Sequence, residues 1–277
     1  MGPLVSGDWL AAHLDDVVVV DVRWYLDGRS GRAAYEAGHV PGARFLDLDA
    51  DLSDPASTER GRHPLPSPER FAAALGRVGV ASGTPVVAYD DAGGSVAARL
   101  WWLLHVLGEP AAVLDGGIAA WPGDLTTEVS EVVPVERPPV PWPTDRFVEP
   151  DDVQDAGVVL DARAAARYAE GDPAIDPRPG HVPGARSAPW AANLGGDGRL
   201  LPAADLRARY EALGVGEATT VVAYCGSGVT ACHDLLALEV AGLGRTALYP
   251  GSWSQWGADP SRPAATGPDG EERVAGV

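Results

Sequence analysis

One cysteine in the second half of the chain stands where a nucleophile could work. Cys225 opens the run Cys225-Gly-Ser-Gly-Val-Thr-Ala231, which follows the apolar residues 220–224 and precedes an apolar helical stretch. Gly226 and Gly228 can adopt conformations closed to other residues, so several backbone N–H groups of the loop can turn inward. Together with the positive end of the helix dipole, such a nest binds an anion and favours the thiolate of a cysteine at its rim.

The alternative for Cys225 is a small buried residue at a strand end, as most free cysteines are. The glycine-bearing loop between a strand and a helix favours the nucleophile instead. The second cysteine, Cys232, lies seven residues further on. This spacing is about two helical turns or roughly 10 Å, so we expect Cys232 to pack within the helix.

The sequence contains two copies of one pattern. Asp21-Val-Arg23 is echoed by Asp161-Ala-Arg163, and Gly38-His-Val-Pro-Gly-Ala-Arg44 recurs unchanged as residues 180–186. Identical residues in the same order predict two domains of one fold. The histidine of the repeated turn is present in both copies, so we expect it to be structural.

Each copy alternates strands with helices. Apolar runs typical of buried strands lie at residues 17–20, 85–89, 158–160 and 220–224. Strands separated by helices predict an α/β protein with two tandem domains, each a mainly parallel sheet flanked by helices. We expect the first domain over residues 1–125, a proline-rich linker over 126–144 and the second domain over 145–277.

The first copy carries Asp90 at the position that Cys225 has in the second, since Ala88-Tyr-Asp90 matches Ala223-Tyr-Cys225. A carboxylate cannot be a sulfur nucleophile, and we expect it to be repelled from an anion cradle. The first domain is therefore predicted to be catalytically silent.

Composition excludes several classes of partner. The chain has 277 residues and a net charge of −18, which argues against nucleic acid and against anionic membrane surfaces. A small anionic substrate stays compatible, because a local positive site can exist on an acidic protein. No stretch approaches roughly 20 apolar residues, and the first ten residues lack the basic start and long apolar core typical of a secretory signal. Two cysteines cannot form a disulfide framework, so we expect a cytoplasmic protein.

These motifs resemble the tandem-domain rhodanese-type sulfurtransferases, the family of thiosulfate sulfurtransferase and 3-mercaptopyruvate sulfurtransferase. The likeness rests on the Cys225 loop, the doubled Gly-His-Val-Pro-Gly-Ala segment, the Asp-x-Arg pairs and Trp256 after Gly251-Ser-Trp. It implies that Cys225 takes sulfur from a small anionic donor as a persulfide and passes it to cyanide, a thiol or a thioredoxin-like acceptor. Loop amides would stabilise the sulfur anion, and no metal or organic cofactor is implied. The loop residues so assigned are Gly226, Gly228, Val229 and Thr230.

The residues after the cysteine bear on the donor. In this family a Cys-Gly-Ser-Gly loop goes with mercaptopyruvate, whereas thiosulfate enzymes typically have basic residues there. Gly226 and Ser227 are not basic, so we expect 3-mercaptopyruvate, with thiosulfate as the alternative. Arginines can bind the donor carboxylate. The resemblance assigns Arg167 to this role, with Arg178 as the candidate for a second arginine.

The resemblance also implies a Ser-His-Asp relay made of Ser227, His63 and Asp49. The histidine and the aspartate would come from the first domain. The alternative for His63 is an exposed loop histidine beside Pro64.

Two other functions fit less well. A cysteine phosphatase on the same fold needs Cys-x5-Arg to clamp a phosphoryl group. Ala231 holds the arginine position here, and the loop is one residue too short for a phosphate. A non-catalytic rhodanese-like binding module fits the first copy, which lacks the cysteine, but not the second. We therefore expect an enzyme.

Overall fold

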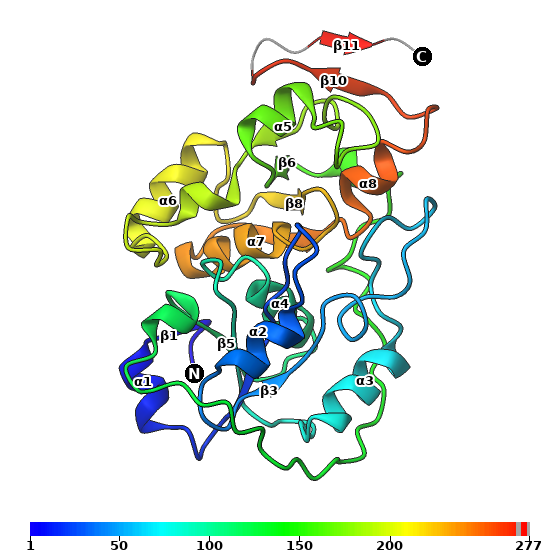
Figure 1. Ribbon diagram of the computed structural model, residues 1–277. Coiled ribbons are helices and arrows are strands. Elements are labelled where there is room, and N and C mark those ends of the chain that lie inside the picture. Colours follow the sequence, from blue (N-terminus) through cyan, green and yellow to red (C-terminus); the bar gives the residue numbers. More distant parts are fainter. Residues whose placement is uncertain (270–272, 276–277) are drawn as a thin grey trace. The chain divides into compact units, whose positions relative to one another are not determined.

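The computed structural model describes residues 1–269 and 273–275, which form two compact units, each with its own sheet (Figure 1). Unit 1 is made of Met1–Asp54, Leu65–Pro143 and Gly196–Leu200. Unit 2 is made of Pro55–Pro64, Thr144–Gly195 and the chain from Leu201 onward. The segment Pro55–Pro64 therefore belongs to the unit that carries Cys225, although it lies in the first half of the sequence.

Unit 1 contains a five-stranded parallel sheet in the order β1-β5-β4-β2-β3. The expected apolar runs are its central strands, β2 and β4, which are buried on both faces as parallel strands require. Its strands are β1 Leu4–Val5, β2 Val18–Asp21, β3 Arg44–Phe45, β4 Val86–Tyr89 and β5 Ala111–Leu114. Its helices are α1 Gly7–Ala12, α2 Gly31–Ala37, α3 Pro68–Arg77, α4 Ala97–His105 and the 3-10 turn η1 Gly117–Ala120.

Unit 2 contains a four-stranded parallel sheet in the order β7-β6-β8-β9. In Figure 1, α7 lies on one side of strands β6 and β8 and α5 lies on the other. Its strands are β6 Val158–Asp161, β7 Arg186–Ser187, β8 Thr220–Tyr224 and β9 Arg245–Leu248, with an antiparallel pair β10 Ala264–Thr266 and β11 Arg273–Ala275. Its helices are η2 Val153–Asp155, α5 Ala165–Glu170, η3 Trp190–Asn193, α6 Ala203–Ala212, α7 Ala231–Ala241 and α8 Ser252–Trp256.

The repeated turn is held in the same way in both units. In unit 2, Arg163 donates to the Asp161 carboxylate and to the carbonyl of Gly180 at 2.8 Å. The His181 ring stacks on Tyr168 with 3.6 Å between ring centroids. The corresponding residues of unit 1 make the same contacts: Arg23, Asp21, Gly38, His39 and Tyr35. The two histidines are structural, as the repetition predicts.

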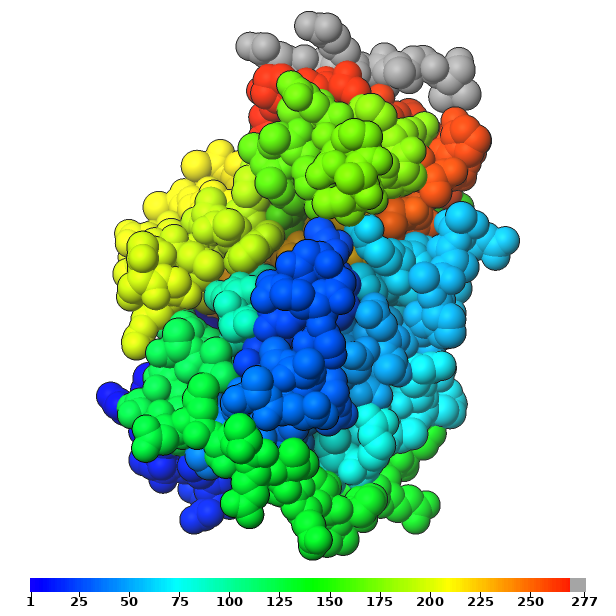
Figure 2. All heavy atoms as spheres, viewed as in Figure 1, coloured from blue at the N-terminus to red at the C-terminus, as the bar shows by residue number. Residues whose placement is uncertain are grey.

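The proline-rich segment after residue 125 is part of unit 1 and packs against the rest of that unit. Val135 donates its backbone N–H to the carbonyl of Gly76 at 2.9 Å, and Arg137 forms an ion pair of 2.6 Å with Glu109. Figure 2 shows this segment, in green, on the outside of the unit. It contains no helix or strand and forms an extended strap.

Parallel strands bring the functional loops of unit 2 to one edge. Strands β6, β8 and β9 are neighbours, so the loops after Asp161, Tyr224 and Leu248 all leave from the carboxyl edge of the sheet, where open α/β sheets bind ligands. Helix α7 is buried over almost its whole circumference and continues from the Cys225 loop. Across the described residues, the helices are all too short or too polar to cross a bilayer.

Candidate active site

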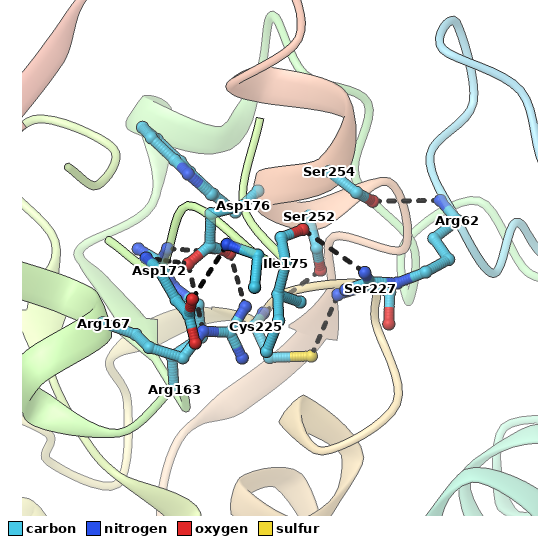
Figure 3. A network of polar contacts seen from close by, with 12 residues as sticks. Arg62, Arg163, Arg167, Asp172, Ile175, Asp176, Cys225, Ser227, Ser252 and Ser254 are labelled. Atoms are coloured by element: carbon cyan, nitrogen blue, oxygen red, sulfur yellow. Dashed lines mark hydrogen bonds and ion pairs between the residues drawn. The ribbon is translucent and has the colours of Figure 1, made fainter. Parts of the chain in front are cut away.

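Cys225 lies at the end of β8 with its sulfur directed at its own loop. The Sγ atom accepts a hydrogen bond from the backbone N–H of Ser227 at 3.4 Å (Figure 3). It accepts another from the backbone N–H of Gly228 at 3.1 Å. The side chain is buried, with 2% of its surface exposed. The predicted arrangement of a thiol facing inward-turned amides is present.

Ser252 fixes the backbone of the nucleophile. Its Oγ accepts from the N–H of Cys225 at 3.1 Å and donates to the carbonyl of Tyr249 at 2.9 Å. Ser252 has a φ of 52°, in the left-handed region that non-glycine residues seldom adopt. No sequence pattern indicates this role of Ser252, because serine is common in turns for many reasons.

Gly228 is required by its surroundings. Its φ is 75°, and a Cβ added there would lie 2.5 Å from the carbonyl oxygen of Pro250. Val229 is buried and Thr230 is half-buried at the start of α7. The loop is tied to α8 because Ser254 donates its backbone N–H to the carbonyl of Gly226 at 2.9 Å.

His63 contacts the serine of the Cys225 loop. Its Nδ1 lies 2.8 Å from Ser227 Oγ, a hydrogen-bond distance, and both side chains are buried. The buried position excludes the alternative of an exposed loop histidine. The third expected member of the relay, Asp49, belongs to unit 1, where its carboxylate accepts from Trp24 Nε1 at 2.9 Å. Its participation stays a prediction.

Arg167 reaches the Cys225 loop and is held by a carboxylate. Its Nε donates to Asp176 at 3.0 Å, and its Nη2 donates to the other oxygen of that carboxylate (Figure 3). Burial alone would raise the pKa of Asp176, but the hydrogen bond and charge of Arg167, with Arg163 nearby, lower it. A Cβ on Gly226 would lie 3.1 Å from Arg167 Nη2.

Arg178 has its contacts elsewhere. Its Nη2 donates to the carbonyl of Arg262 at 2.7 Å, and its guanidinium carbon lies 5.8 Å from the centroid of the Trp253 ring. Burial lowers the pKa of Arg178, with Asp259 opposing the shift. The structure therefore brings Arg167, but not Arg178, to the residue after the nucleophile.

Arg62 is a second guanidinium at the loop that the motifs did not reveal. A Cβ on Gly226 would lie 3.2 Å from Arg62 Nη2. The signal was its place directly before His63 in the run Gly61-Arg-His. A histidine positioned for chemistry makes its chain neighbours candidates for the same site.

A buried polar cluster lies behind the Cys225 loop. The Oδ1 of Asp234 on α7 accepts from Asn193 Nδ2 at 2.8 Å and from the Tyr210 hydroxyl at 3.1 Å. Burial raises the pKa of Asp234 to about 7, although Asn193, Arg209 and Tyr210 oppose the shift. His233 Nδ1 lies 3.2 Å from the same Asn193 amide.

The expectation that a carboxylate would be repelled from the cradle in unit 1 is wrong. Both oxygens of Asp90 lie among backbone donors at 2.8–2.9 Å. The donors are the N–H groups of Ala92, Gly94, Val96 and Ala97. The cradle attracts an anion, and the Asp90 carboxylate is that anion. Burial raises the pKa of Asp90, and the four amides oppose the rise.

The comparisons with known proteins agree with this geometry. The rhodanese-like domain family matches residues 6–124 and 147–259. A probable 3-mercaptopyruvate sulfurtransferase of Pseudomonas aeruginosa is 45% identical over 95% of this chain and 98% of its own length. A putative thiosulfate sulfurtransferase, SseB, of Mycobacterium tuberculosis is 38% identical over 91% of this chain and 92% of its own.

Solved structures give the same result. SseA of Escherichia coli, described as a 3-mercaptopyruvate sulfotransferase with the rhodanese fold, has a TM-score of 0.79 and 34% identity, covering 91% of this chain and 99% of its own. The two matched segments contain strands β2 to β5 of unit 1, strands β6 to β9 of unit 2 and the two paired loops. The fold and family implied by the sequence motifs are thus confirmed, and the chain belongs to the rhodanese family as a two-domain sulfurtransferase.

Proposed function

We propose that this enzyme moves sulfur from 3-mercaptopyruvate to a thiol, a thioredoxin-like protein or cyanide through a persulfide on Cys225. The observation that carries the proposal is the pair of amides that bind the Cys225 sulfur, beside a serine in contact with a histidine. Two of the relatives are named for mercaptopyruvate and one for thiosulfate. No basic side chain directly follows the cysteine, which favours the monoanionic donor.

The first half-reaction needs a nucleophile and a proton. The Cys225 thiolate attacks the thiol sulfur of the donor, and the bond between that sulfur and carbon breaks. Its electron pair stays on carbon, which gives the enolate of pyruvate, and the enolate takes up a proton. The outer sulfur remains on Cys225 as the persulfide. Ser227 and His63 form a path for the proton because they lie within 2.8 Å of each other.

The second half-reaction returns the thiolate. The acceptor attacks the outer sulfur, and the sulfur–sulfur electron pair goes back to Cys225. In the first half-reaction the Cys225 sulfur reacts as the thiolate, and in the second its negative charge returns when the sulfur–sulfur bond breaks. The amides of Gly226, Gly228, Val229 and Thr230 are assigned to stabilise this charge, and Sγ accepts from the N–H groups of Ser227 and Gly228. Arg167 is assigned to the donor carboxylate, Arg178 is the other candidate, and Asp49 would orient His63.

We place the enzyme in the cytoplasm. Both cysteines are free, and a thiolate that must be regenerated at every turnover works best where thiols stay reduced. Unit 1 has a carboxylate in place of the nucleophile, so we assign it no sulfur transfer of its own.

The test compares donors and locates the sulfur. We expect a higher kcat/KM for 3-mercaptopyruvate than for thiosulfate with cyanide as acceptor. Without acceptor, mass spectrometry should find one added sulfur atom on the peptide with Cys225. Cys225→Ser should lose transfer by about 10³-fold or more, because the nucleophile is gone. Cys232→Ser is the matched control and should stay active. A clear preference for thiosulfate would contradict the assigned donor.

A further inference from the structure

Two guanidinium groups meet at the residue after the nucleophile. A Cβ on Gly226 would lie 3.1 Å from Arg167 Nη2 and 3.2 Å from Arg62 Nη2. Like charges this close repel each other, so an anion bound beside both is favoured. Arg167 is the cation that family resemblance assigns to the donor, whereas Arg62 has no assigned role.

The backbone around Arg62 is anchored to helix α8. Its N–H donates to Ser254 Oγ at 3.0 Å (Figure 3). The preceding Gly61 has a φ of 88°, and a Cβ there would lie 2.5 Å from the carbonyl oxygen of Gly251. Gly61 also exchanges two backbone hydrogen bonds with Ser57 at 2.8 and 3.1 Å. These contacts fix where the Arg62 side chain starts, on the same short segment as His63.

The Arg62 side chain lines a cavity of about 390 Å³. The wall combines polar groups, Asp176 and Ser254 among them, with apolar ones such as Ile175. Arg62 Nη1 donates to the carbonyl of Ile175 at 3.4 Å. Arg167 and the Cys225 loop are not among the residues that line this open cavity, so it lies beside the place where the two guanidinium groups meet.

Guanidinium groups at this place suit a carboxylate. Arg167 already binds one, because its Nε and Nη2 donate to the two oxygens of Asp176. Arginine binds carboxylates through two parallel N–H groups, so the carboxylate of a donor fits the same chemistry.

We propose that Arg62, together with Arg167, binds the carboxylate of the sulfur donor beside the Cys225 loop. Arg62 thereby takes the role of second arginine, for which the resemblance made Arg178 a candidate. The inference rests on the proposed function for the identity of the donor. It adds a specificity-determining residue supplied by the segment Pro55–Pro64.

The experiment separates binding from chemistry with Arg62→Gln and Arg62→Lys. We expect Arg62→Gln to raise KM for 3-mercaptopyruvate by about 10- to 100-fold with little change in kcat, because a charge-assisted hydrogen bond is lost. Pyruvate carries the same carboxylate without the reactive sulfur, so its inhibition constant should rise by a similar factor. Arg62→Lys keeps the charge and loses the fork, so its KM should be intermediate. Arg60→Gln, at an exposed arginine of the same segment, is the matched control and should behave as wild type.

Each outcome decides the matter. Unchanged KM and unchanged pyruvate inhibition in folded Arg62→Gln would overturn the inference and leave the proposed function standing. A fall in kcat at constant KM would also overturn it, since Arg62 would then only position the loop. If Arg62→Gln does not fold, the pyruvate inhibition constant of Arg62→Lys decides, and a wild-type value overturns the inference. A wild-type enzyme that forms no persulfide from 3-mercaptopyruvate would overturn both proposals.

Discussion

In unit 1 the loop after β4 directs four backbone amides at Asp90, whereas in unit 2 the loop after β8 directs two amides at the Cys225 sulfur. Both loops join a central parallel strand to the buried helix that follows it. The loop of unit 1 has six residues between Asp90 and α4, and the loop of unit 2 has five between Cys225 and α7.

The comparison shows that anion binding by the loop amides and reactivity of the bound group are separate properties. An inward-facing set of amides stabilises whichever anion the first loop residue supplies. In unit 1 the carboxylate satisfies its amides permanently, so the loop is a structural device. In unit 2 the sulfur can change its bonding, so under the proposed function the same arrangement of amides serves a reaction.

Removing the carboxylate from unit 1 should have the largest effect on stability. Asp90→Ala leaves four N–H groups, three of them buried, without their acceptor, and we expect a loss of about 4 kcal/mol in the free energy of unfolding. Urea denaturation measures it. Asp91→Ala, at an exposed neighbour that accepts one hydrogen bond from Tyr25, should cost less than about 1 kcal/mol. Equal losses in the two variants would show that the cradle does not depend on its anion.

The helices after the two loops differ at their fourth residue, which is Leu100 in α4 and Asp234 in α7. Burial holds the pKa of Asp234 at about 7, against 3.8 as its ordinary value. Between these values the unfolded chain releases the proton that the folded protein keeps, so the free energy of unfolding falls as pH rises. The loss in the free energy of unfolding that comes from ionising Asp234 reaches its full value above about pH 7.

Asp234→Asn should remove this pH dependence. We expect the variant to gain about 2 kcal/mol relative to wild type at about pH 8, and less at about pH 5. Urea unfolding at the two pH values measures the difference. Asp197→Asn, at an exposed carboxylate of unit 1, is the control and should track wild type at both. A constant difference between Asp234→Asn and wild type would mean that Asp234 does not titrate in this range.

The smallest expected effect concerns the residue two positions after Asp90 in one loop and two positions after Cys225 in the other. Ala92 holds this position in unit 1 and Ser227 in unit 2, and both donate their backbone N–H to the group at the centre. Ser227→Ala keeps that amide and removes only the hydroxyl. We expect kcat with 3-mercaptopyruvate to fall about 10-fold, with thiosulfate turnover nearly unchanged. Equal rates for variant and wild type with 3-mercaptopyruvate would remove Ser227 from proton transfer.

The sequence was sufficient for the repeat, the central strands and the loop that carries Cys225, because these depend on local patterns. The match of Ala88-Tyr-Asp90 to Ala223-Tyr-Cys225 located both loops. The expectation for Asp90 was wrong because it considered the negative charge of the carboxylate and left out the partial positive charge of the surrounding N–H groups. An N–H cradle attracts a carboxylate.

Contacts between residues far apart in the chain could not be predicted from the sequence. Arg62 meets the Cys225 loop because its N–H is anchored to Ser254, 192 residues away in the chain. No local pattern encodes such a contact. Arg178 is close to Arg167 in sequence, yet its guanidinium is bound to the carbonyl of Arg262. Proximity along the chain was a poor guide to which arginine faces the site.

Ser252 sets a narrow limit on how this site can evolve. A φ of 52° favours glycine, but glycine would remove the hydroxyl that accepts the Cys225 N–H. Alanine would lose the hydroxyl and keep the backbone penalty. Threonine would restore an oxygen, but its branched side chain is strained in this conformation. Few single substitutions can therefore satisfy both demands, and a survey of all variants at this position should find it among the least tolerant in the chain.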